Sequence, residues 1–364
     1  MKKILIFISS MNAPGGIERV ISNLMREWEN SYEIALLVKD EKPVSFYNLP
    51  EHVQRYSIQE PLQLDMHNRK QRIIEVIKNA LKCHSKLKSA LRNIDYDYIY
   101  TTTPLDSLEV YCASKDSAKK MIISEHASAF AVNKVYQIIK KNIYPKSKCI
   151  IVPNKTDCSI YEGWGCTTHY IPHYLTFKET HKNLLNSKIA INVGRYTADK
   201  RQKELIHIWA GIADKNGWKL WIVGKGEEEN NLREEIQRNG VEDSVKLVPY
   251  TSNIAEIYGQ ASLFLFSSWM EGFGMVLLEA MSFGIPCISY DCPSGPRDVV
   301  RNGVNGYLIP NGDEIEFSKA LDKALHLANT QLQFLGEGAY ETVKKWDNEA
   351  ISKRWEMILD NINK

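Results

Sequence analysis

Two carboxylates, Glu271 and Glu279, bracket a glycine turn in the segment EGFGMVLLE, which follows an apolar run typical of a buried strand. A glycine turn that opens a helix presents unpaired backbone N–H groups and the positive end of the helix dipole to an anion. The segment therefore predicts a phosphate site at the amides of Gly274, Met275 and Val276. Glu279, inside the helix, is predicted to accept hydrogen bonds from ribose hydroxyls, and Glu271 to face the group beyond the phosphate. A purely structural strand–turn–helix with solvated carboxylates is the alternative.

A second candidate anion site follows the apolar run Ile189–Val193. Gly194 and Arg195 come directly after this run, and Lys200 follows five residues after the arginine. A glycine at a strand end with two cations beyond it suits a diphosphate, because arginine offers a planar fork of donors and lysine a compact charge. The same spacing is common on protein surfaces, so alone it specifies little. Gly224-Lys225-Gly226 ends another apolar run and is equally compatible with a simple tight turn.

The elements that must position these residues follow from the alternation of short apolar runs with helical patterns, which predicts parallel α/β sheets. The first half contains the strand candidates Ile4–Ile8, Tyr32–Val38, Tyr98–Tyr100, Lys120–Ile123 and Cys149–Val152. The second half restarts the pattern with Ile189–Val193, Lys219–Val223, Ser244–Leu247, Ser262–Phe266, Pro286–Ser289 and Gly306–Ile309. Each series begins with a strand and a glycine turn. The chain is therefore expected to form two Rossmann-like domains.

The domain boundaries are expected near a polar segment without apolar periodicity, 176–187. We assign residues 1–180 to an N-terminal domain that presents the acceptor and 181–345 to a C-terminal domain that binds the donor nucleotide. The amphipathic pattern within 346–364 predicts a C-terminal helix that packs back toward the N-terminal domain.

The composition is that of an ordinary globular protein, with 364 residues, 25% charged, 44% hydrophobic and a net charge of +2. Basic residues are in excess in the first half and acidic residues in the second, which indicates that the halves do different work. The seven cysteines contain no Cys-x-x-Cys, which favours reduced thiols over disulfides or a zinc site. The opening apolar run is too short for a signal peptide, and none reaches the roughly 20 residues of a membrane span. We expect a cytoplasmic protein, with association with the inner face of the plasma membrane left open.

A strongly basic helix is predicted over 69–92, where Glu75 is the sole acidic residue. The first interpretation is a solvated surface helix with a core-facing apolar stripe, formed by Ile73, Ile74, Ile77, Leu81, Leu87 and Leu91. The second is contact with an anionic membrane surface. Nucleic acid is the least favoured partner, because no nucleic-acid-binding motif accompanies the charge.

In combination, these motifs resemble the family-4 retaining glycosyltransferases with the GT-B fold, over nearly the whole chain. The resemblance is carried by Gly15-Gly16 after the first strand, Gly194-Arg195 with Lys200, the E-x7-E series 271–279, and the segments 284–286, 291–296 and 302–306. It implies two Rossmann-like domains whose parallel sheets face a central cleft. It also implies retaining transfer of a hexose or N-acetylhexosamine from a nucleotide diphosphate sugar, with UDP favoured, in the synthesis of bacterial surface polysaccharide such as capsule or O-antigen.

The resemblance also assigns site residues. His126 stands where the family has a histidine that contacts the donor sugar, although a satisfied core histidine is the alternative. The expected catalytic residues are Glu271, His126, Arg195 and Lys200. The expected donor-binding residues are Gly15, Gly16, Gly194, Gly224, Tyr250, Phe273, Gly274, Met275, Val276 and Glu279. No cofactor and no metal ion are expected, because the cations of the protein would stabilise the leaving diphosphate.

The expected partners are a nucleotide sugar and a saccharide acceptor, for which the basic first half favours a polyprenyl-diphosphate-linked chain. The sequence departs from the family at Arg201, Lys225, His173 and Pro249, which leaves the base and the sugar open. Two other functions are considered, a non-catalytic sugar-nucleotide-binding subunit and a sugar-nucleotide 2-epimerase. An NAD-linked dehydrogenase is disfavoured, because no Gly-x-Gly-x-x-Gly follows the first strand.

Overall fold

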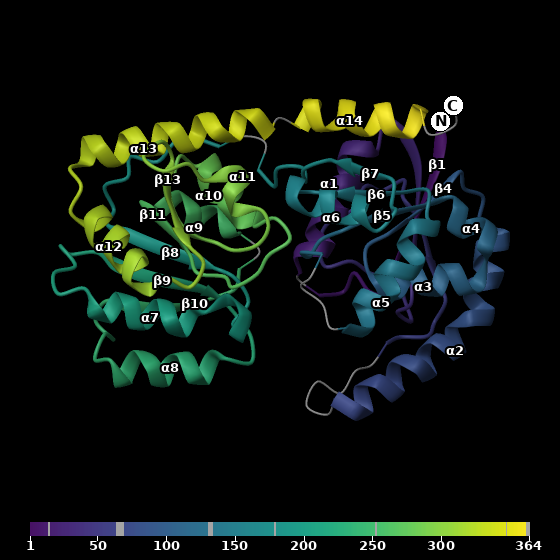
Figure 1. The fold of residues 1–364 in the computed structure, drawn as a ribbon, viewed down its shortest axis with the longest axis horizontal. Helices are drawn as coiled ribbons and strands as arrows, with labels where there is room; N and C mark the ends of the chain where they lie inside the picture. The colour runs from purple at the N-terminus through teal and green to yellow at the C-terminus, as the bar shows by residue number, and fades with distance from the viewer. Residues whose placement is uncertain are drawn as a thin grey trace. The chain divides into compact units, whose positions relative to one another are not determined.

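The computed structural model describes residues 1–13, 15–62, 69–129, 134–177, 180–251, 253–346 and 348–361. The chain divides into two compact units (Figure 1). The first consists of Met1–Thr176 and Asn348–Lys364, and the second of Phe177–Asp347. The C-terminal segment thus returns to the unit that begins the chain.

The first unit contains a seven-stranded sheet in which all paired strands are parallel. Across the sheet the strands are β3 (Gln54–Ser57), β2 (Tyr32–Val38), β1 (Lys2–Ile8), β4 (Tyr98–Thr101), β5 (Met121–Ser124), β6 (Cys149–Val152) and β7 (Thr168–Tyr170). Its helices are α1 (Gly16–Trp28), α2 (Arg69–Asn93), α3 (Pro104–Ala113), α4 (Lys115–Lys119), α5 (Lys134–Ile143), η1 (Tyr144–Lys146), α6 (Lys155–Gly163) and α14 (Asn348–Asn361). From Ile4 onward the central strand β1 is an unbroken apolar run, because helices cover both faces of a parallel sheet.

Alternate residues of β1 enter two separate cores, as the two-residue period of a strand requires. Ile4 and Ile6 join a core formed with α1 and α14, and Leu5 and Phe7 join one formed with α2 and α3. Trp355 of α14 packs edge-on against Trp28 of α1, with ring centroids 5.0 Å apart. The last helix of the chain therefore completes one face of the first sheet, where Figure 1 shows it beside α1.

The second unit contains a six-stranded parallel sheet. Across the sheet the strands are β10 (Val245–Pro249), β9 (Lys219–Gly224), β8 (Ile189–Val193), β11 (Leu263–Phe266), β12 (Cys287–Asp291) and β13 (Gly306–Pro310). Its helices are η2 (Ala198–Lys200), α7 (Gln202–Gly211), α8 (Glu229–Arg238), α9 (Ile254–Gln260), α10 (Met275–Ser282), α11 (Pro296–Val299), α12 (Glu314–Leu325), α13 (Asn329–Val343) and η3 (Lys344–Trp346).

Both sheets have the same order when their strands are counted along the chain, third-second-first-fourth-fifth-sixth, with β7 added to the first. This is the doubly wound Rossmann order, in which the chain changes direction between the first and fourth strands. The predicted fold class of two Rossmann-like parallel α/β domains is confirmed. In such sheets ligands bind beyond the carboxyl ends of the strands at this switch point. Ligand sites are therefore expected at the carboxyl ends of β1 and β4 in the first sheet and of β8 and β11 in the second.

Two further parts of the chain differ from the prediction. The boundary was expected within 176–187, but residues 180–187 pack on the second unit, where the Asn183 backbone N–H donates to the Phe283 carbonyl (2.9 Å) and Leu185 is buried. In α2, the prediction of a single core-facing stripe is wrong for three of its members, because Ile74, Ile77 and Leu81 are exposed. The side of the helix that contains Cys83, Leu87 and Leu91 packs into the core instead.

Candidate functional site

The glycine turn before α10 is fixed by its backbone and by its neighbours. Gly274 has a left-handed φ of 83°, and a Cβ there would lie 3.2 Å from the Phe266 ring. Gly295, also left-handed at φ 96°, approaches the Phe273 carbonyl so closely that a Cβ would lie 2.1 Å from its oxygen. Glycine is needed at both positions. The turn therefore holds the first amides of α10, those of Met275 and Val276, at the end of the helix where an anion is stabilised.

Lys200 and Glu271, 71 residues apart, form an ion pair with Nζ 2.5 Å from Oε1. Their side chains are 17% and 19% exposed, so the pair is partly sheltered but open to solvent. Burial alone would lower the pKa of Lys200, but the Glu271 carboxylate outweighs it by charge and hydrogen bonding, and the pKa is raised. Lys200 is therefore a fixed cation at neutral pH.

The loops that carry this pair are fastened to each other at the β8/β11 switch point. Ser267 Oγ donates a hydrogen bond to the Lys200 carbonyl (2.7 Å), and the Trp269 backbone N–H donates to the Asp199 carbonyl (2.8 Å). Two hydrogen bonds between the same loops thus support the ion pair. The structure brings together two of the predicted catalytic residues at the place where the topology leaves room for a ligand.

Arg201 stands where the resembling family often has glycine, and the structure explains that preference. Its φ is 50°, in the left-handed region that disfavours residues with a Cβ. The Arg201 guanidinium carbon lies 4.0 Å from the centroid of the Trp269 ring, a cation–π contact. Gly312 leaves space for this arginine, since a Cβ there would lie 3.2 Å from Nη1. The strained backbone is offset by stacking against the loop that leads to Glu271.

Glu279 is buried, with 4% of its surface exposed, and accepts a hydrogen bond from the hydroxyl of Tyr258 in α9 at 2.9 Å. Buried carboxylates require such partners, because an unsatisfied one carries a large desolvation penalty. Tyr258 is absent from the residues selected by sequence. Its position in α9, 21 residues before Glu279, gives no local pattern that links the two.

Three predicted donor-site residues end neighbouring strands of the second sheet. Gly194 follows β8 and donates its N–H to the Val223 carbonyl (3.0 Å), and Tyr250 follows β10 and donates to the Gly224 carbonyl (3.1 Å). A Cβ at Gly224 would lie 1.9 Å from the Gly194 carbonyl oxygen, so the close approach of the two strand ends requires glycine there. Arg195 is exposed at the same edge. These residues therefore lie along the same carboxyl edge as Lys200 and Glu271.

His126 lies in the first unit, after β5, and its ring stacks on His173 with centroids 5.0 Å apart and an interplanar angle of 12°. Burial lowers the pKa of His126 well below its ordinary value, and the neighbouring His173 lowers it further. Burial lowers the pKa of His173 to about 4. Both rings are therefore neutral at neutral pH. Among the described residues, no hydrogen-bond partner meets the buried Nε2 of His126.

Gly15 and Gly16 lie at the N-terminus of α1, also in the first unit. Gly15 is extended (φ −152°) and a Cβ at Gly16 would have no neighbour within 4 Å, so neither backbone conformation demands glycine. The predicted site residues are thus divided. His126 and this glycine pair belong to the first unit, and the others belong to the second.

Comparison with known proteins now adds to this geometry. Residues 176–342 match the family described as glycosyl transferases group 1. The amylovoran biosynthesis glycosyltransferase AmsD of Erwinia amylovora is 25% identical over 99% of this chain and 100% of its own length. A Campylobacter jejuni α-1,4-N-acetyl-D-galactosaminyltransferase, whose name specifies a PP-undecaprenol-linked acceptor, is 24% identical over 100% of this chain and 99% of its own. The structure of S. aureus TarM with fondaparinux, α-GlcNAc-glycerol and UDP has a TM-score of 0.80 at 15% identity, and covers both chains completely.

Residues 176–342 therefore form a domain of the glycosyl transferases group 1 family, and the whole chain has the GT-B fold. The family match covers nearly all of the second unit and includes the β8 loop, the ion pair and α10. The family resemblance read from the sequence is confirmed. None of the helices in the described ranges is long and apolar enough to cross a membrane.

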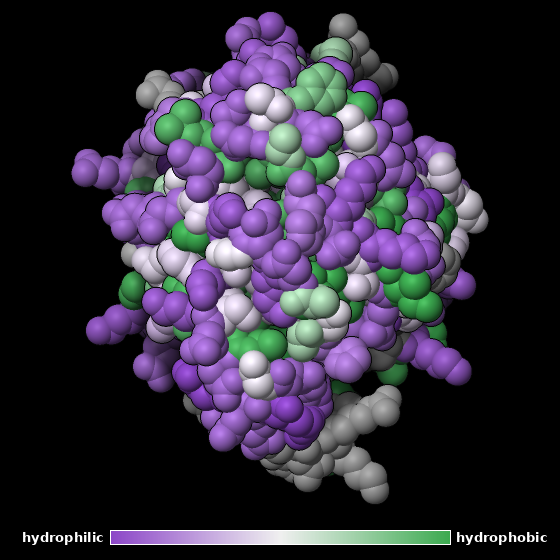
Figure 2. Space-filling view, turned by 90° about the vertical axis from the view of Figure 1, so that its left-hand side faces the viewer, coloured by the Kyte–Doolittle hydropathy of each residue, from purple (hydrophilic) through white to green (hydrophobic). Residues whose placement is uncertain are grey.

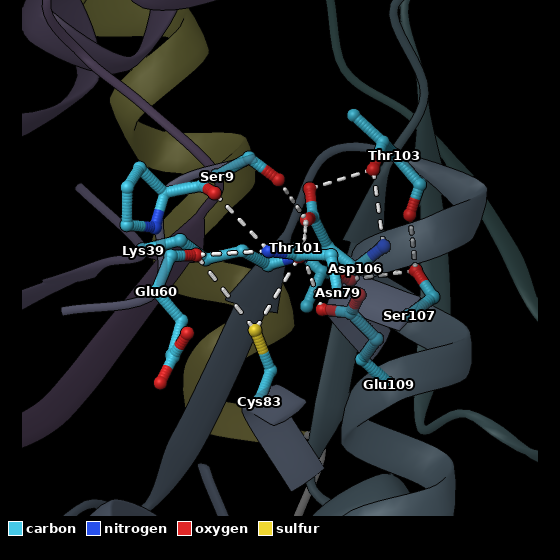
Figure 3. Close-up of polar contacts among 11 residues, drawn as sticks. Ser9, Lys39, Glu60, Asn79, Cys83, Thr101, Thr103, Asp106, Ser107 and Glu109 are labelled. Atoms are coloured by element: carbon cyan, nitrogen blue, oxygen red, sulfur yellow. Dashed lines mark hydrogen bonds and ion pairs between the residues drawn. The ribbon is translucent and has the colours of Figure 1, made fainter. Parts of the chain in front are cut away.

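The first unit has its own polar cluster at the β1/β4 switch point, drawn in Figure 3. Lys39 Nζ lies 2.5 Å from Glu109 Oε2 and 4.0 Å from Asp106 Oδ1, and all three side chains are buried. Ser9 Oγ and Thr103 Oγ1 donate hydrogen bonds to Asp106 at 2.9 and 2.6 Å. Burial raises the pKa of both carboxyls, and the Lys39 charge opposes that rise. The cluster ties the end of β1 to α3.

One Asp-x-Asp triplet, the spacing that can hold a divalent cation, occurs in the sequence at Asp95–Asp97. It precedes β4, at the amino edge of the first sheet. Asp95 accepts a hydrogen bond from Lys3 Nζ (2.7 Å), and Asp97 accepts one from the Lys3 backbone N–H (2.8 Å). The triplet is therefore engaged in structure at the edge opposite to the switch point.

Proposed function

We propose that this glycosyltransferase transfers a hexose or N-acetylhexosamine from a UDP-sugar, with retention of the anomeric configuration and without a metal ion. The acceptor is a glycan or a lipid-linked saccharide in the synthesis of a bacterial surface polysaccharide, such as capsule or O-antigen. The observation that carries this proposal is the Lys200–Glu271 pair at the β8/β11 switch point. Support for the donor and the acceptor comes from TarM, which was solved with UDP, and from the lipid-linked acceptor in the name of the Campylobacter enzyme.

The diphosphate leaves more easily when its growing negative charge meets fixed cations and dipoles. In this proposal Lys200 and Arg195 supply the cations, and the first amides of α10 supply the helix dipole, so that a metal ion is dispensable. Because Lys200 is held by a carboxylate before the donor binds, the diphosphate takes over part of that interaction. Glu271 is then released to accept hydrogen bonds from sugar hydroxyls.

The nucleoside is bound by the buried end of the site. Glu279, oriented by Tyr258, accepts hydrogen bonds from the ribose hydroxyls. Gly194, Gly224 and Tyr250 provide the strand-end backbone against which the nucleotide lies. Phe273 holds the turn from inside the unit, where it is 2% exposed.

His126 contributes from the first unit as a neutral imidazole that bonds a sugar hydroxyl through Nε2. Gly16, where a Cβ would have no neighbour within 4 Å, leaves an open approach to the first turn of α1, and in this proposal Gly15 and Gly16 face the acceptor. Retention follows when the leaving group departs and the acceptor attacks on the same face of the sugar. A covalent intermediate would need a carboxylate at the anomeric carbon, and in this proposal Glu271 binds hydroxyls instead.

The decisive experiment incubates the purified full chain with a panel of UDP- and GDP-sugars, with and without a polyprenyl-diphosphate-linked saccharide. Release of UDP from one sugar, stimulated by the acceptor and unchanged by EDTA, is the expected result. NMR of the product should show the donor's anomeric configuration. A strict Mn²⁺ requirement, an inverted product or turnover with GDP-sugars alone would each contradict one part of the proposal. Binding without turnover of any donor would favour a non-catalytic subunit.

A further inference from the structure

Helix α2 exposes an apolar stripe to solvent. Ile74, Ile77 and Leu81 are 45%, 54% and 73% exposed. Their spacings of three and four residues place them on one side of the helix. Scattered single hydrophobic residues are ordinary on protein surfaces, but three large ones aligned on one helix side form a continuous strip.

The orientation of α2 about its axis is fixed by its opposite side. Asn79, Cys83, Leu87 and Leu91, spaced by four, are buried, and the last three join the core beneath the helix. Asn79 Nδ2 also donates hydrogen bonds to the carbonyls of Glu60 (3.1 Å) and Pro61 (3.2 Å). The helix therefore cannot bury the exposed stripe by rotating without losing these contacts.

Cations border the stripe on the same side. Lys78 and Lys82 lie one position after Ile77 and Leu81, while Lys88 and Arg92 continue the outward side toward the end of the helix, and all four are exposed. Glu75 is the sole acidic residue in the sequence of α2. A helix with an apolar strip, lysine at its margins and a surplus of positive charge has the character of one that lies in a membrane interface.

The positive charge beside the stripe also indicates which partner binds there. Two copies of the chain meeting through this stripe would bring Lys78 and Lys82 against the same lysines of the other copy, which repel. A nucleic acid would match the cations but would leave the isoleucines and the leucine without an apolar partner. An anionic bilayer satisfies both, because its phosphates meet the lysines and its acyl boundary receives the apolar side chains. Figure 2 views the molecule from the side of the second unit. On that face, hydrophobic residues lie in small groups among hydrophilic ones.

We propose that α2 is the surface by which this glycosyltransferase docks on an anionic lipid bilayer. Ile74, Ile77 and Leu81 enter the boundary between headgroups and acyl chains, while Lys78 and Lys82 contact lipid phosphates. This inference goes beyond the sugar transfer proposed above. It is tested without donor or acceptor, so a failure of either proposal leaves the other standing.

The test measures co-sedimentation of the full chain with vesicles of phosphatidylcholine alone and of phosphatidylcholine mixed with phosphatidylglycerol. We expect binding to the mixed vesicles alone, and weaker binding as salt is raised. The variant Lys78→Gln/Lys82→Gln should bind about fivefold more weakly for each lysine removed. The variant Ile77→Ser/Leu81→Ser should bind about tenfold more weakly or worse.

The matched control is Ile315→Ser/Phe334→Ser, which removes side chains of similar exposure (69% and 68%) from the second unit. It should bind vesicles like the wild type, and all variants should unfold at the wild-type temperature because the changed side chains are exposed. Equal binding to neutral and anionic vesicles, no binding by the wild type, or wild-type binding by both α2 variants would overturn the proposal. A concentration-dependent dimer in ultracentrifugation, abolished by Ile77→Ser/Leu81→Ser, would assign the stripe to a second copy instead.

Discussion

Each unit has a lysine–glutamate pair near the switch point of the same topology, but the two pairs differ in exposure. In the second unit the Lys200–Glu271 pair at the β8/β11 switch point is 17% and 19% exposed. In the first unit the Lys39–Glu109 pair beside the β1/β4 switch point is 0% and 6% exposed, with Asp106 at 0% beneath it. The sheet topology therefore sets where the two charge pairs lie, and burial determines whether a ligand can reach them.

The difference teaches which pair is available to a ligand. A buried ion pair has lost its hydration, and removing one partner strands the other charge in a poorly solvated site. Such a pair holds structure. A pair that is partly exposed can exchange its partner for a substrate group at small desolvation penalty, which is the exchange that we propose for Lys200.

The largest effect should follow loss of the buried lysine. Lys39→Met keeps the aliphatic stem but leaves Asp106 and Glu109 without their cation, and should lower the free energy of unfolding by about 3–5 kcal/mol. A carboxyl whose folded pKa is raised stabilises the fold below its ordinary pKa and loses that stabilisation as pH rises. The deficit should therefore be larger at pH 8 than at pH 5. Urea titrations at both pH values measure it, with the exposed Lys42→Met as control. A deficit that is absent or independent of pH would show that the buried pair is dispensable.

Loss of the partly exposed Lys200 should affect turnover instead. Lys200→Ala should reduce kcat by about 10²-fold or more, because a fixed charge at the leaving diphosphate is lost. The unfolding temperature should change little, as for other partly exposed pairs. Steady-state kinetics on the donor identified above provide the measurement, with Lys203→Ala, on the neighbouring turn of α7, as control. Wild-type turnover in Lys200→Ala would remove the diphosphate assignment.

Acid should destabilise the unit that buries histidines. The folded pKa of His173 is about 4, against an ordinary value of 6.5. Between pH 6.5 and pH 4, His173 is protonated in the unfolded chain but stays neutral in the folded chain. The free energy of unfolding therefore falls as pH drops through this range. From pH 7 to pH 5 the loss attributable to this group should be about 2 kcal/mol. His173→Phe should remove that part of the pH dependence in chemical denaturation curves. If the free energy of unfolding depended on pH equally in His173→Phe and in the wild type, His173 would not be the cause of the acid destabilisation.

The buried end of the second site should respond more modestly. Tyr258→Phe removes the hydroxyl that donates to Glu279 and should weaken UDP binding about tenfold, the effect of one hydrogen bond to a charged group. Calorimetric titration with UDP measures this, and Tyr340→Phe in α13 serves as control. Unchanged affinity would mean that Glu279 is oriented without Tyr258.

The smallest effect concerns Arg201, which follows Lys200 directly in the chain. Arg201→Gly relieves a left-handed backbone worth about 1 kcal/mol but loses stacking of similar size on Trp269, so stability should stay within about 1 kcal/mol of wild type. Arg201→Ala keeps the strain and loses the stacking, and should be the less stable of the two in thermal unfolding. Both variants lose the stacking, so the reverse order would show that the left-handed strain is smaller than the entropic cost of glycine.

Much of the fold could be predicted because its signals are local. Most residues of β1, β2, β6 and β8 are buried and apolar, because helices cover both faces of a parallel sheet. The edge strands β3 and β7 were not predicted. Their sequences, QRYS and THY, are partly or largely exposed and lack an apolar pattern, because an edge strand is held mainly by backbone hydrogen bonds that any residue can make.

The sequence by itself determined the two α/β series, the glycines at Gly274 and Gly224, and the chemical types of the site residues. These depend on periodicity and on backbone conformation, which neighbouring residues set. Only the tertiary structure decided that Lys200 meets Glu271 and that Tyr258 holds Glu279. It also decided that Lys39 is fully buried while Lys200 is partly exposed. Such partners are tens of residues apart, and their contact depends on how strands are ordered in the sheet. The same holds for α2, where the helical period fixes two sides but only packing determines which one faces solvent.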